Sequence, residues 1–459
     1  MRINEKLRQH WLLIIILSGS FLIKLAILLK LKHMILLGDE VDYLWHGLRI
    51  ARGDSFETKE LLQGGYVHFN PSHWGPGYIY FIGIILRFFN EKVFMIKLVQ
   101  VILSTISVYL IYILAKKIFN ESIALLSAFI FSIYPTLIAF THYLWSETLY
   151  IFLLVIIIFF LIVFSLKKNK GYLLMAGIVL GLASLVKSVI FYFLPLIVFW
   201  LFLVYFKNFK AFLISSTVFL IACASVITPW TLRNYYTYGR FLLVDTNAGT
   251  VVWYNLNFFD SENYDWGGLI GKKLTRANGR EKCNTGNVVD DYRCELKNGI
   301  KFIIKNPSLF IKGSVTKLCD FWNPTSFLIR HMRAGYYGVK PGLALARVIT
   351  LVTVGSYIGV IIFGIFGFFY SKNDLIKVLF LFLIFYYILI HMVMFGMSRY
   401  RLPIEPFIMV YASYAILNFK VIMKNIFKDK KWLSVTAAVL LFTVMWYRYF
   451  PALFDIFGQ

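Results

Sequence analysis

The sequence predicts an all-α polytopic membrane protein, and three observations support this prediction. First, 59% of the 459 residues are hydrophobic and 19% are aromatic, with a mean hydropathy of +0.71. So large an apolar share does not fit inside a globular domain of this length. Second, the apolar runs recur near the ~20 residues that a helix needs to cross a bilayer. Third, they lack the ~10-residue alternation of a membrane β-barrel, so the spans are expected to be helices.

About eleven runs meet this length criterion, and each is expected to form one transmembrane helix. The first run is long for a signal peptide and shows no small-residue cleavage site, so we interpret it as the first span. In chain order the runs cover residues 11–29, 93–115, 123–140, 148–166, 172–186, 189–205, 211–227, 343–370, 375–397, 404–419 and 432–446.

Two shorter helices are expected in the first long connection, residues 31–92. The apolar residues Val41, Leu44 and Leu48 recur at helical spacing, and the pattern stops at Arg52-Gly53. Residues 77–89 are apolar and aromatic but too short for a full crossing. Both segments are therefore predicted to be interfacial helices at the depth of the lipid headgroups.

The charge distribution predicts the orientation in the membrane. The chain has 47 Lys and Arg against 23 Asp and Glu, a net charge of +24. The basic clusters fall in alternate connections, on the same side as the N-terminus. This positive-inside pattern predicts a cytoplasmic N-terminus, outer loops at 31–92 and 229–342, and an external C-terminus. It also excludes nucleic acid as a partner, because the positive charge is explained by topology and membrane lipids.

Two of the four cysteines, Cys283 and Cys294, lie in the long outer loop. An oxidising compartment could pair them, but their spacing leaves a disulfide and two free thiols equally open. The one Asn-x-Ser/Thr motif, at Asn120, is expected to face the cytoplasm. The lack of an outer glycosylation motif favours the plasma membrane of a prokaryote.

Polar residues gather on the predicted outer side. Three acids in four residues, Asp39, Glu40 and Asp42, open the first loop of an acid-poor chain. A transporter would need its polar groups near the middle of the bilayer, whereas this arrangement favours an enzyme that works at the outer surface. The other outer candidates are His73, His142, Glu147, Lys187, Arg233, Arg399, Tyr400 and Arg401.

Six motifs in order resemble a known family. They are GDEVDY at 38–43, PGY at 76–78, SET at 146–148, GLASLVK at 181–187, PWTLRNY at 229–235 and RYRLPIEP at 399–406. The set resembles the GT-C class of membrane glycosyltransferases, in particular the bacterial protein O-mannosyltransferase and aminoarabinose (lipid A) transferase superfamily. Two positions depart from the family pattern: Gly75 stands where a proline is usual, and His73 stands near the place of a basic residue.

The resemblance implies a GT-C fold and an inverting glycosyltransferase. It would move a sugar from a polyprenyl-phosphate donor, such as undecaprenyl phosphate, to a hydroxyl acceptor on a lipid, glycan or protein at the extracytoplasmic face. The catalytic module would cover residues 1–420, followed by a cytoplasmic basic loop and a final helix in 421–459. We expect a monomer. Two alternatives stay open: a flippase or transporter of lipid-linked sugars, and a surface-polysaccharide ligase.

The residue roles follow from the chemistry of such a transfer. A hydroxyl is a poor nucleophile, so a carboxylate must take its proton as it attacks. Asp39 is the expected base, Glu147 is expected to orient the acceptor or assist, and Glu40 is a further catalytic candidate. The departing phosphate gains negative charge, which suits cationic side chains. Because these can neutralise it, we expect no cofactor and no divalent metal. The phosphate-binding candidates are Arg399, Arg401, Arg233, Lys187 and His73, and the substrate-binding candidates are Tyr43, His142, Tyr400 and Asn247.

Several of these residues also have purely structural explanations. Asp39 and Glu40 would suit the N-terminal end of a helix, where acids interact favourably with the dipole. Lys187 would suit a turn from which its ammonium reaches the interface. His142 would suit a buried hydrogen-bonding position, and Arg401 a contact with lipid headgroups.

Overall fold

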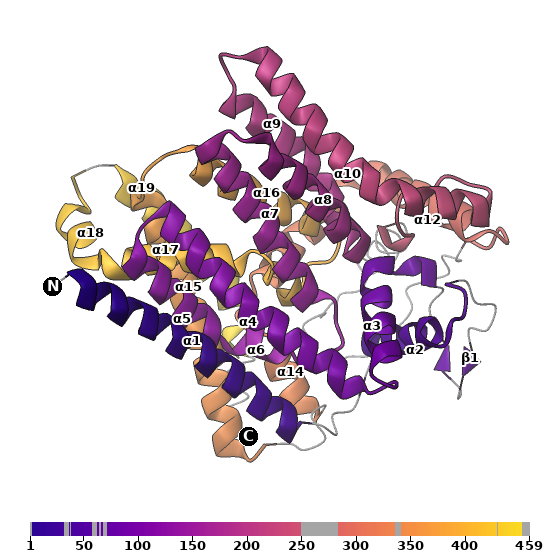
Figure 1. The fold of residues 1–459 in the computed structure, drawn as a ribbon, viewed down its shortest axis with the longest axis horizontal. Helices are drawn as coiled ribbons and strands as arrows, with labels where there is room; N and C mark the ends of the chain where they lie inside the picture. The colour runs from indigo at the N-terminus through magenta and orange to yellow at the C-terminus, as the bar shows by residue number, and fades with distance from the viewer. Residues whose placement is uncertain are drawn as a thin grey trace.

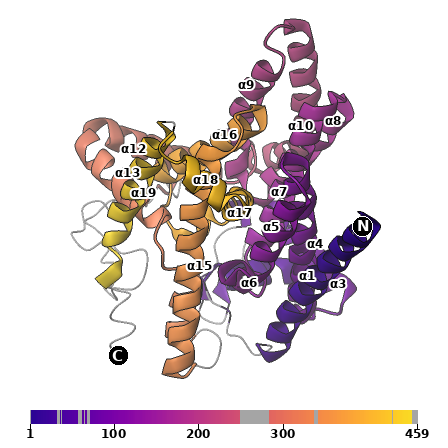
Figure 2. The ribbon, with the colours of Figure 1, turned by 90° about the vertical axis from the view of Figure 1, so that its left-hand side faces the viewer.

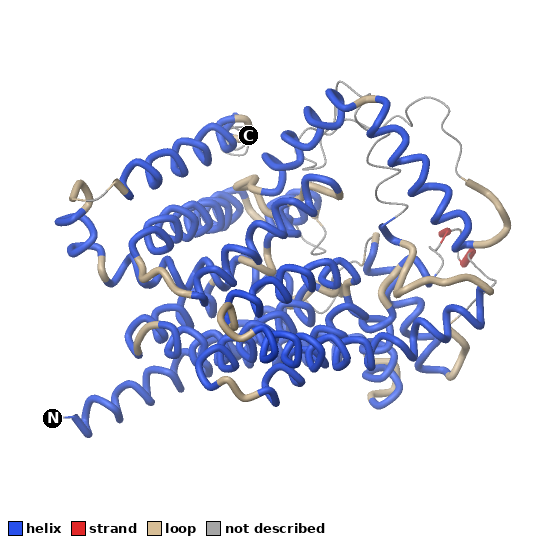
Figure 3. Tube along the Cα trace, turned by 90° about the horizontal axis from the view of Figure 1, so that it is seen from above, coloured by secondary structure: helices blue, strands red, loops and turns tan. Residues whose placement is uncertain are grey.

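The computed structural model describes residues 2–31, 36, 38–56, 62–63, 66–67, 71–248, 283–335, 341–428 and 430–451. Nearly all of these residues are helical (Figure 1). Among the described residues, strands occur only in one short antiparallel hairpin, β1 (Leu62–Gln63) and β2 (Tyr66–Val67), which Figure 3 shows at one edge of the molecule. The predicted all-α membrane fold is confirmed.

The helices of the N-terminal half begin with α1 (Arg2–Lys30) and end with α10, a helix of 30 residues. Between them and including α10 lie α2 (Asp39–Arg52), η1 (Pro71–His73), α3 (Pro76–Phe88), α4 (Val93–Ile118), α5 (Glu121–Ile133), α6 (Pro135–Phe140), α7 (Glu147–Lys167), α8 (Lys170–Val186), η2 (Ser188–Phe193), α9 (Leu194–Val204) and α10 (Phe209–Tyr238). The later elements are α12 (Val288–Lys305), α13 (Pro307–Phe321), α14 (Phe327–Ala334), α15 (Leu343–Tyr370), α16 (Leu375–Val393), η3 (Ser398–Arg401), α17 (Glu405–Leu417), α18 (Phe419–Asn425) and α19 (Lys431–Tyr447).

All eleven predicted apolar runs are helical, but only some form one long helix. In the described part of the chain, six helices are long and apolar enough to cross a membrane. A seventh is added if α17 and α18, which are bent by 73° relative to each other, are taken as one span. The remaining predicted spans are shorter helices of 10–17 residues or broken pairs.

Two helices depart from the predicted spans. Proline explains the first departure, whereas in the second the helix continues through a proline. The expected helix at 123–140 breaks at Tyr134, because Pro135 lacks the N–H that a continuous helix needs and starts α6 instead. By contrast, α10 continues through Pro229 to Tyr238, eleven residues beyond the predicted end at Ile227. The PWTLRNY motif is therefore helical and not the start of a loop.

The two short helices expected in the first connection are present. α2 ends where the sequence pattern stops, and Gly53 caps it in the left-handed region with φ 90°. α3 packs against α2 and also against α8, so this pair lies beside the main bundle (Figure 1).

The two halves of the chain form adjacent groups of helices, seen from the side in Figure 2. α4 packs against α5 and α7, and α8 lies between α7 and α10. In the later half α15 packs along α17, and α17 contacts α5 to join the groups. The buried aromatic and aliphatic side chains form one continuous core through both groups.

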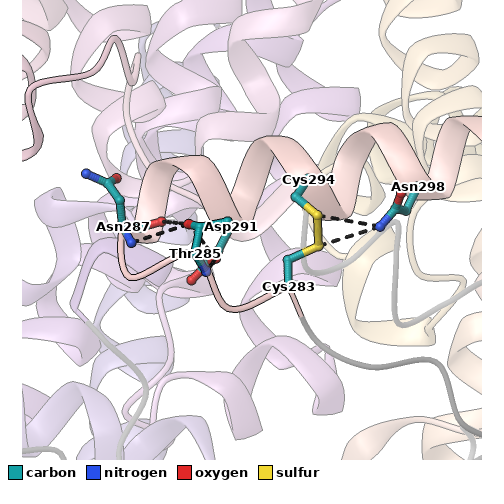
Figure 4. The surroundings of a disulfide bond; sticks show 6 residues. All are labelled: Cys283, Thr285, Asn287, Asp291, Cys294 and Asn298. Atoms are coloured by element: carbon teal, nitrogen blue, oxygen red, sulfur yellow. Dashed lines mark hydrogen bonds between the residues drawn. A yellow bond between two sulfur atoms is a disulfide. The ribbon is translucent and has the colours of Figure 1, made fainter.

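A disulfide links Cys283 to Cys294 (Figure 4). It joins the segment before α12 to the first turns of that helix. Asn298 of the same helix donates its side-chain amide to both sulfur atoms at 3.5 Å. Of the two possibilities that the spacing left open, the structure has the bonded pair.

Candidate active site

A cavity of about 130 Å³ lies where four distant parts of the chain meet. They are the start of α2, the start of α7, the turn between α8 and η2, and the segment around η3. A fifth wall comes from residues 245–248, just after α10. Four of the six motifs, at 38–43, 146–148, 181–187 and 399–406, contribute residues to the lining, and Trp74 and Gly75, just before the PGY motif, also line it. Helix ends thus gather the polar groups at one place.

Asp39 and Arg399 form an ion pair inside this cavity. The Arg399 Nη2 atom lies 2.9 Å from Asp39 Oδ2. The Asp39 side chain is 30% exposed, whereas that of Arg399 is 14% exposed. Asp39 is the first residue of α2, and no side-chain capping bond is formed at that helix end. The carboxylate is therefore directed to the guanidinium and open to a ligand.

Arg399 keeps its charge at any working pH. Burial acts against the charged form, but the neighbouring Tyr400, Asp39 and Glu147 outweigh it and raise the pKa of Arg399 well above its usual value. The guanidinium also lies over the Trp145 ring, 4.8 Å from its centroid. Its Nη2 atom donates to the Tyr400 hydroxyl at 3.1 Å.

Glu147 and Lys187 form a second pair, which is more deeply buried. Lys187 Nζ donates to Glu147 Oε1 at 2.7 Å, and the Glu147 side chain is 2% exposed. Arg399 Nε lies 3.9 Å from the same oxygen. Burial lowers the pKa of Lys187, while Glu147 opposes that shift. Glu147 therefore holds both cations of the cavity in place.

Aromatic rings complete the walls. Tyr43 packs against Trp74 with ring centroids 4.8 Å apart, and it is held edge-on by Tyr78 at the same distance. Burial, and then the charges of Asp39 and Glu147, raise the pKa of Tyr43, so its hydroxyl stays protonated. On the other side Tyr400 stacks on His391 at 4.8 Å.

Seven of the sequence-based candidates line the cavity. They are Asp39, Tyr43, Glu147, Lys187, Asn247, Arg399 and Tyr400. Their arrangement was not visible in the sequence, because they come from segments separated by up to 360 positions. The structure shows this proximity, whereas their catalytic or binding roles remain proposals.

The other five candidates lie outside the cavity lining. Two of them are buried and connect separate segments through hydrogen bonds. Glu40 is 2% exposed, and its Oε1 accepts a hydrogen bond from the Leu144 backbone N–H at 2.8 Å. Arg401 is also 2% exposed, paired with Glu405 at 2.7 Å and bonded to the Phe321 carbonyl. Arg401 therefore does not face lipid headgroups, and neither residue lines the cavity.

Arg233, His73 and His142 also lie outside the cavity lining. The Arg233 guanidinium lies over the Trp230 ring at 4.8 Å. His73 lies beside Trp74, edge-on at 4.8 Å. The His142 ring nitrogens bond to the Ile138 and Lys24 carbonyls at 2.8 and 3.0 Å, the buried role that its sequence position also allowed.

The sequence reasoning missed Asp245, which lines the same cavity and is 8% exposed. The available signal was an acid in an acid-poor chain, ten residues after the PWTLRNY motif. No group of three His, Cys, Asp or Glu side chains suited to a metal ion is found among the described residues.

Comparison with known proteins connects this geometry to a family. Residues 72–230, about a third of the chain, match the model of the dolichyl-phosphate-mannose-protein mannosyltransferase family. No curated protein shows significant similarity in sequence. Among solved structures, the archaeal oligosaccharyltransferase AglB of Archaeoglobus fulgidus, solved with an inhibitory peptide and a dolichol-phosphate, aligns with a TM-score of 0.51 at 15% identity.

This chain has the GT-C fold. The alignment with AglB covers 96% of this chain and 56% of that protein, so this chain spans about half of its length. The apo form of the same oligosaccharyltransferase gives the same TM-score at 14% identity. ArnT from Cupriavidus metallidurans, solved with undecaprenyl phosphate, aligns at a TM-score of 0.39 and 12% identity over 86% of this chain and 78% of that one. The alignment with AglB confirms, for the fold alone, the resemblance found in the sequence motifs.

Proposed function

We propose that this protein transfers a sugar from a polyprenyl-phosphate donor to a hydroxyl acceptor. The observation that carries the proposal is the Asp39–Arg399 pair, 2.9 Å long and accessible from one cavity. One substrate bound in the cavity could therefore contact both the proposed general base and the proposed phosphate-binding cation. The GT-C fold and the partial match to a dolichyl-phosphate-mannose-using family support this reaction class.

The reaction is a single displacement. The acceptor oxygen forms a bond to the anomeric carbon as its proton passes to Asp39. The bond from that carbon to the phosphate oxygen breaks, and the electron pair leaves with the lipid phosphate. Arg399 and Lys187 stabilise the charge that develops there. Attack opposite to the leaving group inverts the anomeric centre.

Because Asp39 and Arg399 are paired before substrate binds, donor binding is expected to separate them. A phosphate oxygen that binds the Nη2 edge of Arg399 would compete with Asp39, because Asp39 occupies that edge in this structure. Donor binding would release the carboxylate to accept a proton. Glu147 keeps its contact with Lys187 during this exchange, since it lies on the buried side of both cations.

The central test is Asp39→Asn in a membrane preparation with labelled donor lipid. The amide keeps the size of the side chain but cannot take the proton, so we expect turnover to fall by roughly 10²–10⁴-fold. Asp54→Asn is the matched control, because Asp54 lies just after the other end of α2, paired with Arg49 and 45% exposed. Full transfer by Asp39→Asn would remove Asp39 as the base.

We further propose that the reaction needs no divalent metal. Arg399 and Lys187 both line the cavity, and in this proposal they neutralise the phosphate, which is the task that a metal would otherwise perform. Transfer is expected to continue unchanged after EDTA treatment and dialysis. Loss of transfer under EDTA, restored by added Mn²⁺ or Mg²⁺, would contradict this part of the proposal.

We place the active site at the extracytoplasmic face of a prokaryotic plasma membrane, with the N-terminus in the cytoplasm. The Cys283–Cys294 disulfide supports this side for the segment before α12, because such bonds persist in oxidising compartments. The basic clusters in alternate connections support the same orientation.

A further inference from the structure

The segment at residues 242–246 is held rigidly by the PWTLRNY motif. Three side chains of that motif bond to its backbone carbonyls. Trp230 Nε1 donates to Val244 O at 3.0 Å, and Thr231 Oγ1 donates to Leu243 O at 2.8 Å. Asn234 Nδ2 donates to the carbonyls of residues 242 and 244, both at 3.1 Å. The motif thus acts on the segment that follows α10 and not on the cavity itself.

The far end of the segment is fixed to the first connection. Thr246 donates to Ser72 O through its backbone N–H at 2.8 Å and through its hydroxyl at 3.2 Å. Asp245 lies between these two anchored points. A side chain on so constrained a backbone has a fixed position, as a binding group requires.

Asp245 lies where two cavities adjoin. The second cavity, of about 310 Å³, shares Ser188, Tyr192, Asp245 and Ala248 with the first. The first cavity alone is below the roughly 300–1,000 Å³ that is usual for ligand sites. A donor that carries a sugar as well as a phosphate therefore needs space on both sides of Asp245.

The Asp245 carboxylate differs from the other two acids of the cavity. Asp39 and Glu147 each pair with a cation. Within the described ranges, no Lys or Arg forms an ion pair with Asp245. The Ser188 hydroxyl and the Asn247 backbone N–H, the latter at 3.2 Å, bond to it. A carboxylate has about four lone-pair sites, so Asp245 has the capacity to accept further hydrogen bonds from neutral donors.

We propose that Asp245 binds hydroxyl groups of the sugar on the donor lipid and so makes the site selective for the glycosylated carrier. This inference rests on the proposed function. The sugar is bonded directly to the phosphate, and Ser188, the partner of Asp245, directly follows the phosphate-binding candidate Lys187. With the phosphate at Lys187, the sugar ring would lie beside Ser188 and Asp245.

The test compares two kinds of lipid on the full chain in nanodiscs. Bare undecaprenyl phosphate is titrated beside undecaprenyl phosphate carrying mannose, glucose, galactose or N-acetylglucosamine, with affinity measured by calorimetry. For the sugar that the wild type binds best, Asp245→Asn is expected to lower affinity about tenfold, as for a lost charge-assisted hydrogen bond. Affinity for the bare carrier is expected to stay unchanged, which also shows that the variant is folded.

Two control variants separate the possible causes. Arg399→Ala is expected to weaken binding of both kinds of lipid, because its partner is the phosphate. Asp290→Asn changes a partly buried acid near the same segment, paired with Arg240, and is expected to change neither.

Other outcomes overturn the inference in distinguishable ways. Equal loss for both lipids would assign Asp245 a structural role, and no loss would exclude a sugar contact. A raised KM for the acceptor, with donor affinity intact, would place the acceptor there instead. A wild type that gains no affinity from any sugar overturns this inference alone, whereas one that binds none of the lipids overturns the proposed function with it.

Discussion

At the scale of single residues, the buried charges of the cavity depend on one another. Glu147 is 2% exposed and has Lys187 at 2.7 Å and Arg399 at 3.9 Å. Charges removed from water at such a site are tolerated only while they are paired. The cavity therefore depends on the complete set, and removal of one partner affects the remaining ones.

This dependence predicts the result of a double-mutant cycle. Lys187→Met leaves the Glu147 carboxylate buried without its nearest partner, so we expect a loss of about 3–5 kcal/mol of stability. Combining it with Glu147→Gln removes the unpaired charge, and the double variant is expected to be more stable than Lys187→Met alone. Thermal unfolding in detergent measures both effects. Lys167→Met, at the exposed far end of α7, is the control, and equal unfolding midpoints for the single and double variants would contradict the coupling.

Asp245 predicts a pH dependence of donor binding. Burial raises the pKa of Asp245 from its ordinary 3.8 to about 6. As pH falls through about 6 the carboxylate is protonated and loses acceptor capacity, so affinity for the glycosylated carrier is expected to fall there and to be full above pH 7. Tyr192, Tyr292 and Arg293 line the cavity beside it, and burial raises the pKa of Tyr292, so that hydroxyl stays neutral over this range.

The matched measurement uses Asp245→Asn with the same lipid, because titration of other groups is then common to both proteins. The wild-type affinity is expected to approach that of the variant below pH 5. The same shift lowers stability as pH rises from about 4 to 6, since the folded state binds the extra proton. Asp245→Asn is therefore expected to raise the unfolding temperature at pH 7, and parallel pH profiles would argue against an ionised Asp245.

The sequence was a better guide to which charged residues matter than to where their side chains lie. Asp39, Glu147, Lys187 and Arg399 were found because acids are scarce in this chain and polar residues gather at the span ends on the predicted outer side. Glu40 and Arg401 stood in the same motifs, but a single sequence does not show which neighbour turns into the core. Asp245 was missed because its importance comes from contacts with a helix that the sequence reasoning had ended too early.

At the scale of elements, the N-terminal end of α3 and the C-terminal end of α8 approach each other closely. A Cβ atom on Gly75 would lie 2.6 Å from the Leu185 carbonyl oxygen and 2.7 Å from that of Val186. Both atoms belong to backbone and cannot move without displacing the end of α8. The Gly75 position, where the related motif has a proline, therefore matches a close backbone approach that fixes Trp74 and Lys187 in the same cavity.

Gly75→Ala is expected to damage this contact. The added methyl group must push the end of α8 away, so we expect a lower unfolding temperature and reduced transfer, with Lys187 displaced. Gly342→Ala is the matched control, because a Cβ atom there would have no neighbour within 4 Å and the backbone φ is −56°. Wild-type transfer by Gly75→Ala would show that the site tolerates movement of α8.

The hydrogen bonds that Trp230, Thr231 and Asn234 donate to residues 242–244 lead to a second prediction at this scale. Trp230→Phe keeps an aromatic ring beside Arg233 and Phe56 but removes the N–H that bonds to Val244. We expect partial loss of selectivity for the glycosylated carrier, smaller than that of Asp245→Asn. Trp11→Phe, on a side chain that is 63% exposed, is the control. Unchanged selectivity in Trp230→Phe would show that the hydrogen bonds from Thr231 and Asn234 are enough to hold the segment in place.

Helix positions were predictable to the extent that apolar composition determines them. The eleven apolar runs and the two short helices before α4 all proved helical, because buried or lipid-facing backbone must satisfy its own hydrogen bonds. The breaks were less predictable. Pro135 interrupts a run as expected of proline, whereas Pro229 lies inside α10.

At the scale of the whole molecule, the helix ends show which parts share one side of the membrane. α7 begins in the cavity at Glu147, and its 21 residues rise about 30 Å, the thickness of a bilayer core, to Lys167. The turn at Asn169 therefore lies on the opposite side from the active site. α12 contributes Tyr292 and Arg293 to the second cavity, so its disulfide lies on the cavity side.

This geometry makes the orientation testable by thiol labelling in intact cells. In a chain with Cys223→Ala and Cys319→Ala, only the disulfide pair remains. A membrane-impermeant reductant followed by an impermeant maleimide is expected to label Cys283 and Cys294 without permeabilisation. Adding Cys283→Ser, Cys294→Ser and Asn169→Cys moves the thiol to the opposite end of α7, and labelling is expected only after permeabilisation. The reverse pattern would place the cavity in the cytoplasm, where a base and two cations would face a carrier lipid on the other leaflet.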